Sequence, residues 1–310
     1  MRYLYGIGDT FWDVTQKAKL LGLYLGCNNL YVQKDTFSHL FGDPVYGEHK
    51  VLVCDKPTLE VYTEQHASPI LELTSIPEPM LPAFPISKKE VLSDEEIDEI
   101  LRKLHEKTVI LYENISWEYP EQCLAIKHIK SHNKVLEIGG SVGRCATVIS
   151  HILDKQENLV TLETDPDQFK RLCVNRAINR RSFQVVNATL SSVPLYQHHD
   201  HVYTLEQCKE RNVSLHIPVK TMTFDELQTL CNVKFDVMWI DCEGSFLGIL
   251  KMFPAMLDNV QLLMIENDFQ TRAEMDEVIK MFIDRGFKII DARSGTWGPC
   301  IDMFHQIWAR

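Results

Sequence analysis

From residue 91 onwards, short apolar runs alternate with segments whose apolar residues lie three or four positions apart. The short runs are rich in β-branched residues, which is typical of buried parallel strands. The spaced segments are typical of amphipathic helices. This alternation predicts an α/β fold: a Rossmann-like, doubly wound, seven-stranded and mostly parallel sheet with helices on both faces. The expected strands are 135–138, 159–162, 183–186, 235–240, 262–265, 287–290 and 303–308.

Residues 1–75 follow a different pattern, in which short aromatic and β-branched runs are separated by Gly, Asn, Asp and Pro turn signals. This predicts a small β-rich module. Four prolines then crowd residues 76–90 and predict an extended linker, because proline fixes φ and removes a backbone donor. The predicted parts are therefore the module at 1–75, the linker at 76–90 and the α/β domain at 91–310. We interpret the module as a structural or oligomerising appendage, through which the chain would form a homo-oligomer.

The connection at 191–218 is long and polar, and a hairpin is expected around Val202 and Tyr203. It contains the run His198-His199-Asp200-His201, whose residue types could bind a metal. Consecutive residues point in different directions, so they rarely share one ion with the geometry that zinc requires. We therefore interpret this run as a solvated or acceptor-facing loop.

Composition narrows the function. The net charge of −11 over 310 residues argues against a broad phosphate-binding surface for nucleic acid. No apolar run reaches transmembrane length, and no apolar signal core precedes Asp9. Nine cysteines, an odd number, include no Cys-x-x-Cys pair, which favours reduced thiols in the cytoplasm and no structural zinc. The sequence therefore predicts a cytoplasmic protein with no membrane span and no nucleic-acid partner.

A glycine-rich turn follows the expected strand 135–138. The dinucleotide fingerprint counted from Gly139 fails, because Ser141 and Arg144 stand where it needs glycines, and no P-loop Gly-Lys-Ser/Thr is present. The actual order, Glu-x-Gly-Gly-x-x-Gly, resembles the first motif of methyltransferases that use S-adenosylmethionine (SAM). The alternative is a tight strand-to-helix turn that binds nothing.

Polar residues recur at the carboxyl ends of the expected strands, the edge at which open α/β sheets bind ligands. They are Gly139, Glu163, Asn187, Asp241 and Glu266. Glu163 can accept hydrogen bonds from both hydroxyls of a ribose. The amide of Asn187 can read an adenine edge. Each has an ordinary alternative as a turn residue.

Five blocks carry a resemblance to the FkbM-like methyltransferases. In chain order they are Leu136-Glu-Ile-Gly-Gly-Ser-Val-Gly143, Leu162-Glu-Thr-Asp-Pro-Asp167, Val186-Asn-Ala-Thr-Leu-Ser191, Thr223-Phe-Asp-Glu-Leu227 and Trp239-Ile-Asp-Cys-Glu-Gly244. The resemblance covers about residues 130–270 and implies a class I fold that transfers a methyl group from SAM to sugar or polyketide hydroxyls. It implies SAM-binding positions at Glu137, Gly139, Gly140, Gly143, Glu163, Asn187, Ala188 and Asp241. It implies catalytic positions at Asp241, Glu243 and Glu266.

The end of the fifth expected strand departs from that pattern, because Glu266-Asn267-Asp268 is unusually polar. It resembles the metal site of Mg²⁺-dependent O-methyltransferases. Asp241 and Glu266, with Asn267 or Asp268, offer the oxygen ligands that this hard cation prefers. The alternative is that these groups only hydrogen-bond the acceptor or the loop backbone.

The sequence thus predicts a SAM-dependent O-methyltransferase whose acceptor is a sugar hydroxyl of a glycan or glycoconjugate. Three alternatives remain open at this point: methylation of a non-sugar metabolite, methylation of a protein, and a non-catalytic binding module that keeps the fold. An NAD-dependent dehydrogenase is disfavoured by the glycine spacing.

Overall fold

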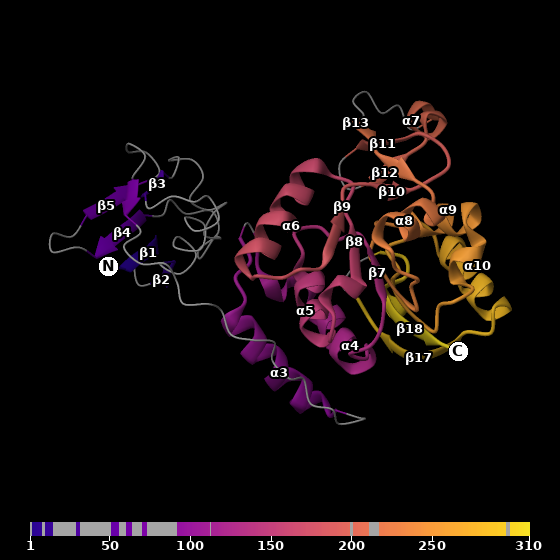
Figure 1. The fold of residues 1–310 in the computed structure, drawn as a ribbon, viewed down its shortest axis with the longest axis horizontal. Coiled ribbons are helices and arrows are strands. Elements are labelled where there is room, and N and C mark those ends of the chain that lie inside the picture. The colour runs from indigo at the N-terminus through magenta and orange to yellow at the C-terminus, as the bar shows by residue number, and fades with distance from the viewer. Residues whose placement is uncertain are drawn as a thin grey trace.

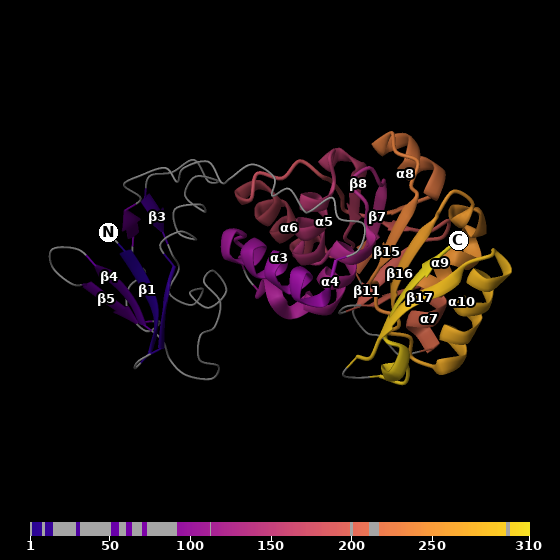
Figure 2. The same cartoon turned by 90° about the horizontal axis from the view of Figure 1, so that it is seen from below.

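The computed structural model describes residues 2–7, 10–14, 29–31, 51–55, 60–63, 70–72, 92–111, 113–198, 201–210, 217–295 and 298–310. From residue 92 onwards, these residues form a central sheet between two layers of helices (Figures 1 and 2). The sheet has seven strands in the order β17-β18-β16-β15-β7-β8-β9, and β18 is antiparallel to both of its neighbours. The predicted doubly wound, mostly parallel sheet is therefore confirmed. Its strands are β7 (Val135–Ile138), β8 (Leu159–Leu162), β9 (Gln184–Val186), β15 (Val237–Ile240), β16 (Leu262–Glu266), β17 (Lys288–Arg293) and β18 (His305–Ala309).

Apolar side chains on both faces of the central strands explain this layering. Alternate residues of β7 enter different hydrophobic clusters: Leu136 and Ile138 join one, and Val135 joins the other. The first cluster packs against α8 (Phe224–Cys231), α9 (Phe246–Met252) and α10 (Arg272–Asp284). The second packs against α3 (Asp94–Lys107), α4 (Tyr119–His128), α5 (Arg144–Ile152) and α6 (Pro166–Ile178). Successive strand residues point to opposite faces, so a continuous apolar run requires cover on both sides.

The strand order reverses between β7 and β15. The chain builds β8 and β9 on one side of β7, and β15 and β16 on the other. In open α/β sheets, the crevice at the carboxyl ends of the two strands flanking such a reversal is the usual ligand site. The turns that follow β7 and β15 therefore define where the site should lie.

The connection between β9 and β15 folds into small sheets of its own. Strand β10 (Thr189–Leu190) pairs in parallel with β14 (Thr221–Met222). Strands β11 (Leu195–His198) and β12 (His201–Tyr203) form the hairpin expected around Val202 and Tyr203, and β13 (Ile217–Val219) pairs with β11. Helix α7 (Leu205–Glu210) follows β12.

The described N-terminal residues are all strands, apart from Val14 after β2, and the module itself stays a prediction. Strands β1 (Arg2–Ile7), β2 (Thr10–Asp13), β4 (Val51–Asp55) and β5 (Glu60–Thr63) form an antiparallel sheet, and β3 (Asn29–Tyr31) pairs with β6 (Ile70–Glu72). The proline-rich segment 76–90 lies outside the described residues, so the predicted boundary stays a prediction.

Two further expectations concern membrane-spanning helices and the cysteines. Within the described ranges, no helix is long and apolar enough to cross a membrane. All seven cysteines whose side chains are described are free thiols.

Candidate cofactor-binding and active site

The glycine turn after β7 brings that strand close to the end of β15. Gly139 has φ +95°, and a Cβ added there would lie 1.5 Å from the backbone oxygen of Asp241. At Gly140, an added Cβ would lie 2.2 Å from Cγ2 of Thr161 on β8. Gly143 caps the start of α5 with φ +89°. Only glycine combines this left-handed backbone with so close an approach, so the turn is shaped by two neighbouring strands.

Glu163, directly after β8, is buried against this turn. Its Oε2 accepts the Ser141 N–H at 2.7 Å, and its Oε1 accepts the Asp165 N–H at 2.7 Å. Burial raises the pKa of Glu163 to about 7, although the two backbone hydrogen bonds act in the opposite direction. Each carboxylate oxygen retains a lone-pair direction for a ligand. The geometry therefore presents a rigid, buried acceptor at the rim of the glycine turn.

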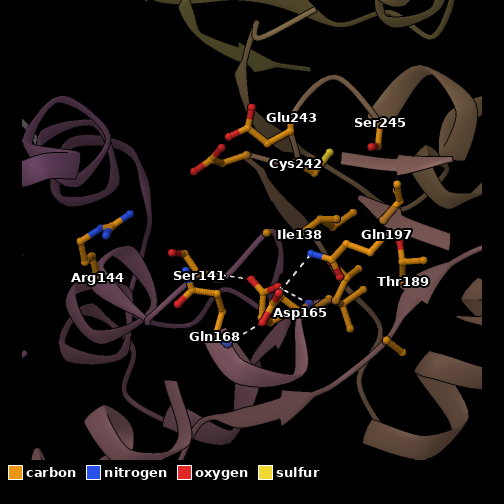
Figure 3. Close-up of a pocket in the computed structure, with 17 residues that line it drawn as sticks. Ile138, Ser141, Arg144, Asp165, Gln168, Thr189, Gln197, Cys242, Glu243 and Ser245 are labelled. Carbon is orange, nitrogen blue, oxygen red and sulfur yellow. Dashed lines mark hydrogen bonds between the residues drawn. The ribbon is translucent and has the colours of Figure 1, made fainter. Parts of the chain in front are cut away.

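A pocket opens between these two features and the loop after β15. Figure 3 shows Arg144 on one side of it, Thr189 and Gln197 on the other, and Glu243 at the end of the sheet. Among the candidates from the sequence, Gly139, Glu163, Ala188, Asp241 and Glu243 line the pocket. The pocket thus lies at the reversal of strand order, where the topology places it.

Several candidates lie just behind the lining. The carboxylate of Glu137 is buried beneath the turn, and burial raises its pKa to about 8. Gly140 and Gly143 shape the turn without lining the pocket. The Asn187 amide donates to the carbonyl oxygens of Glu163 at 2.8 Å and Thr164 at 3.1 Å. In this structure, Asn187 therefore holds the Glu163 loop rather than facing the pocket.

Sequence reasoning missed part of the lining. Ser141 and Asp165 come from the turns after β7 and β8, and Gln168 lies in the first turn of α6, which Asp165 caps by accepting the Gln168 N–H at 2.8 Å. Gln197 and Val202 are register partners in the β11–β12 hairpin. Gln197 donates to Asp165 at 3.5 Å and so joins the hairpin to the pocket rim. For Gln197 and Val202, the signal in the sequence was the long, polar connection at 191–218 that contains them.

Beyond Asp241, the same edge of the sheet holds a cluster of buried acids. Asp241 is hydrogen-bonded to Glu266, which follows from the parallel pairing of β15 and β16. Burial raises the pKa of both carboxyls, and each is raised further by the charge of Glu121. At neutral pH the Asp241–Glu266 pair therefore shares a proton rather than carrying two full charges.

Among the described residues, Arg144 at the start of α5 has a guanidinium group that faces this cluster. It forms salt bridges with Glu113 and with Glu118, the latter at 2.5 Å. Glu118 also accepts the Cys145 N–H at 3.0 Å, at the start of α5. The positive charge of Arg144 is therefore engaged by its own pair of carboxylates.

The loop after β15 has an unusual backbone. Glu243 has φ +52° and Gly244 has φ +75°, two successive left-handed residues. Asp268 secures this loop, because its Oδ1 accepts the Gly244 N–H at 2.7 Å. Left-handed backbone at a residue other than glycine is costly and persists where the surroundings impose it. The loop is thus held in the conformation that places Glu243 at the pocket.

The metal ligands expected from the sequence do not all come together. The amide nitrogen of Asn267 donates to the carbonyl oxygens of Met303 at 2.7 Å and Phe304 at 3.2 Å, which binds this side chain to the segment before β18. Instead, Glu266 lies with Glu121 of α4 and His305 of β18, with one potential ligand atom from each within 4.8 Å of the others. Of the expected set, Glu266 alone belongs to this trio.

No protein-family model matches the chain, and no curated protein matches it either. Among solved structures, an O-methyltransferase from Bacillus cereus in complex with SAH shares 14% identity over 71% of this chain and 93% of its own, with a TM-score of 0.39. Fibrillarin from Aeropyrum pernix with bound SAM shares 11% identity over 84% and 94%, with a TM-score of 0.37. At these scores the likenesses carry no argument, and the fold rests on the strand order of this chain.

Proposed function

We propose that this protein is a SAM-dependent O-methyltransferase. The observation that carries the proposal is the glycine turn fitted against Asp241 and bonded through Ser141 to the buried Glu163 carboxylate. A Cβ at Gly139 would fill the space where the turn meets β15, so the cradle requires glycine there. The spacing of the glycines differs from the dinucleotide fingerprint. The turn therefore suits a nucleoside ligand that lacks a pyrophosphate.

Different residues of the pocket would contact different parts of the cofactor. Glu163 would accept the ribose hydroxyls, since its carboxylate is buried and already oriented by two backbone donors. Ala188, Thr189 and Gln168 line the pocket and would contact the base. Gly139, which packs against Asp241, would lie next to the methionine moiety.

Bound SAM supplies an electrophilic methyl group, whose bond to sulfur breaks as the bond to the acceptor oxygen forms. Asp241 lines the pocket and would take the hydroxyl proton as that oxygen attacks. Its hydrogen bond with Glu266 lets the pair hold the additional proton together. Glu243 would orient the acceptor from the opposite end of the same loop.

We propose a sugar hydroxyl of a glycan as the acceptor. The support is the resemblance of the five sequence blocks together with the surplus of carboxylates at this edge, because carboxylates accept hydrogen bonds from polyol hydroxyls. Binding a sugar hydroxyl does not require a positively charged surface. A glycan acceptor therefore agrees with the net charge of −11.

Calorimetry with S-adenosylhomocysteine and with NAD tests the cofactor assignment. We expect S-adenosylhomocysteine to bind one per chain and NAD to give no heat. Preference for NAD would overturn the proposal. A methyl-transfer assay with isotopically labelled SAM and a glycan panel then tests the reaction. Methylation of metabolites or proteins alone would replace the acceptor, and binding without transfer to any acceptor would indicate a non-catalytic module.

A further inference from the structure

The trio of Glu121, Glu266 and His305 is assembled by the fold from three elements. Glu266 and His305 are register partners in the antiparallel pairing of β16 with β18, so the sheet itself places them side by side. Glu121 reaches them from α4, and its Oε1 lies 2.8 Å from His305 Nε2. Glu121 and His305 are 5% and 4% exposed. The arrangement is therefore fixed by packed elements rather than by loops.

A histidine–glutamate pair alone leaves this trio unsatisfied. Oε2 of Glu121 is buried and has no hydrogen-bond partner among the described residues, and the same holds for Nδ1 of His305. A buried polar atom without a partner destabilises the fold, because it has lost its hydrogen bonds to water. The unpaired oxygen of Glu121 lies next to the Glu266 carboxylate and the His305 imidazole. A bound cation would give it a partner.

The local charge balance supports a cation as well. Asp241, Glu118 and Asp268 add their carboxyls to those of Glu121 and Glu266. Facing them are His305 and Arg144, and the guanidinium is engaged by Glu113 and Glu118. Buried carboxylates in contact repel one another, and a nearby positive charge relieves that repulsion.

The ligand types indicate which cation would bind. One imidazole nitrogen and two carboxylates form a mixed nitrogen and oxygen set, which suits divalent first-row transition metals better than Mg²⁺. Three protein ligands leave coordination positions open, as in catalytic rather than structural metal sites.

We propose that Glu121, Glu266 and His305 bind a divalent transition-metal ion next to the cofactor pocket. The ion would lie on the Glu266 side of Asp241, which lines that pocket. Its open positions would bind the acceptor hydroxyl and lower the pKa of that hydroxyl, a role that rests on the proposed function. This set differs from the one implied by the sequence resemblance, because His305 and Glu121 replace Asn267 and Asp241.

Metal titration of the full chain tests the proposal without using activity. Chelator-treated protein is titrated with Mn²⁺ and, separately, with Zn²⁺ in a calorimeter. We expect one ion per chain, and at least about tenfold weaker binding in Glu121→Gln and in His305→Gln, since even supporting partners of metal ligands are worth that much. The matched control is His128→Gln, because His128 also pairs with a carboxylate, Asp291, at 3.0 Å but belongs to no such trio.

Each result of the titration either supports or overturns the metal site. Absence of ion binding, or equal affinity in the wild type, Glu121→Gln and His305→Gln, would overturn the proposal. So would an ion whose affinity falls in Asn267→Ala while those two variants keep theirs. Circular dichroism of the same samples shows that each variant is folded, and S-adenosylhomocysteine binding is measured on them separately. Ion binding without cofactor binding would sink the proposed function and leave the metal site standing, and the reverse result would do the opposite.

Discussion

The carboxyl edge of the sheet has two halves that treat buried carboxylates in opposite ways. In the half after β8, both oxygens of Glu163 accept backbone N–H groups, and the supporting amide of Asn187 is bonded twice. In the half after β15 and β16, Oε2 of Glu121 and Oδ2 of Asp268 are buried without partners among the described residues. The Glu163 carboxylate of the first half is therefore oriented before a ligand arrives, whereas the second half contains carboxylate oxygens that lack donors.

This difference indicates how each half would be used. A preorganised acceptor binds a neutral ribose with little rearrangement, because its geometry is already fixed. A cluster of mutually repelling carboxyls instead has raised pKa values and a high affinity for protons and cations. The first half thus suits binding, and the second suits proton transfer or metal binding at the reacting atoms.

The largest expected effect comes from breaking the turn that joins the halves. Gly139→Ala would place a methyl group 1.5 Å from the Asp241 oxygen in a left-handed backbone. We expect a loss of at least about 3 kcal/mol in unfolding free energy, from backbone strain and from separation of β7 and β15. Chemical denaturation followed by circular dichroism measures this loss.

Gly286→Ala is the matched control for that substitution. Gly286 has φ +84°, close to the value at Gly139, but an added Cβ there meets nothing within 4 Å. We expect it to lose only about 1–2 kcal/mol, the cost of a left-handed backbone alone. Equal losses in the two variants would show that the contact between the turn and β15 contributes nothing.

The next largest effect concerns catalysis in the second half. Asp241→Asn should lower the methyl-transfer rate about 100-fold or more, as for a lost general base, while S-adenosylhomocysteine affinity stays within about threefold. Steady-state kinetics and calorimetry separate the two quantities. Asp268→Asn is the control, because Asn can still accept the Gly244 N–H while one titratable carboxyl is removed from the same cluster. A rate loss as large in Asp268→Asn as in Asp241→Asn would assign the effect to charge rather than to a base at Asp241.

The sequence predicted the first half of the site much better than the second. Gly139, Glu163 and Asp241 each follow an apolar strand, and parallel strands end at one edge, so local pattern and topology together determine their meeting. Glu121 and His305 are 184 positions apart, and their contact depends on how α4 packs over β18. No local pattern marks such a pair.

The limits of the fold prediction have a similar cause. The central strands β7, β8 and β15 were predicted because apolar runs buried on both faces are distinctive. The apolar spacing of residues 247–256 predicts one helix there, but the structure divides it, because Phe253 leaves the helical conformation ahead of Pro254, which begins a 3₁₀ turn over Pro254–Leu257. The hairpin of β11 and β12 was expected, but its role in lining the pocket was not, since Gln197 reaches Asp165 only through tertiary packing.

The smallest effect is a pH dependence in the first half. The pKa of Glu163 is raised to about 7 by burial, so the unliganded carboxyl is largely protonated at pH 6 and largely ionised at pH 8. Ribose hydroxyls donate best to the ionised form, so binding below the pKa must first release a proton. The affinity for S-adenosylhomocysteine should therefore rise with pH, by roughly tenfold between pH 6 and pH 8.

Glu163→Gln isolates this contribution, because an amide keeps one acceptor oxygen and does not titrate. We expect the variant to bind S-adenosylhomocysteine about 1–3 kcal/mol more weakly at pH 8, from the loss of charge-assisted hydrogen bonds. Its affinity should change little over the same pH range. Other titratable groups of the pocket, Asp165, Asp241 and Glu243, remain in the variant. A pH dependence as steep in Glu163→Gln as in the wild type would therefore assign the titration to one of these remaining groups.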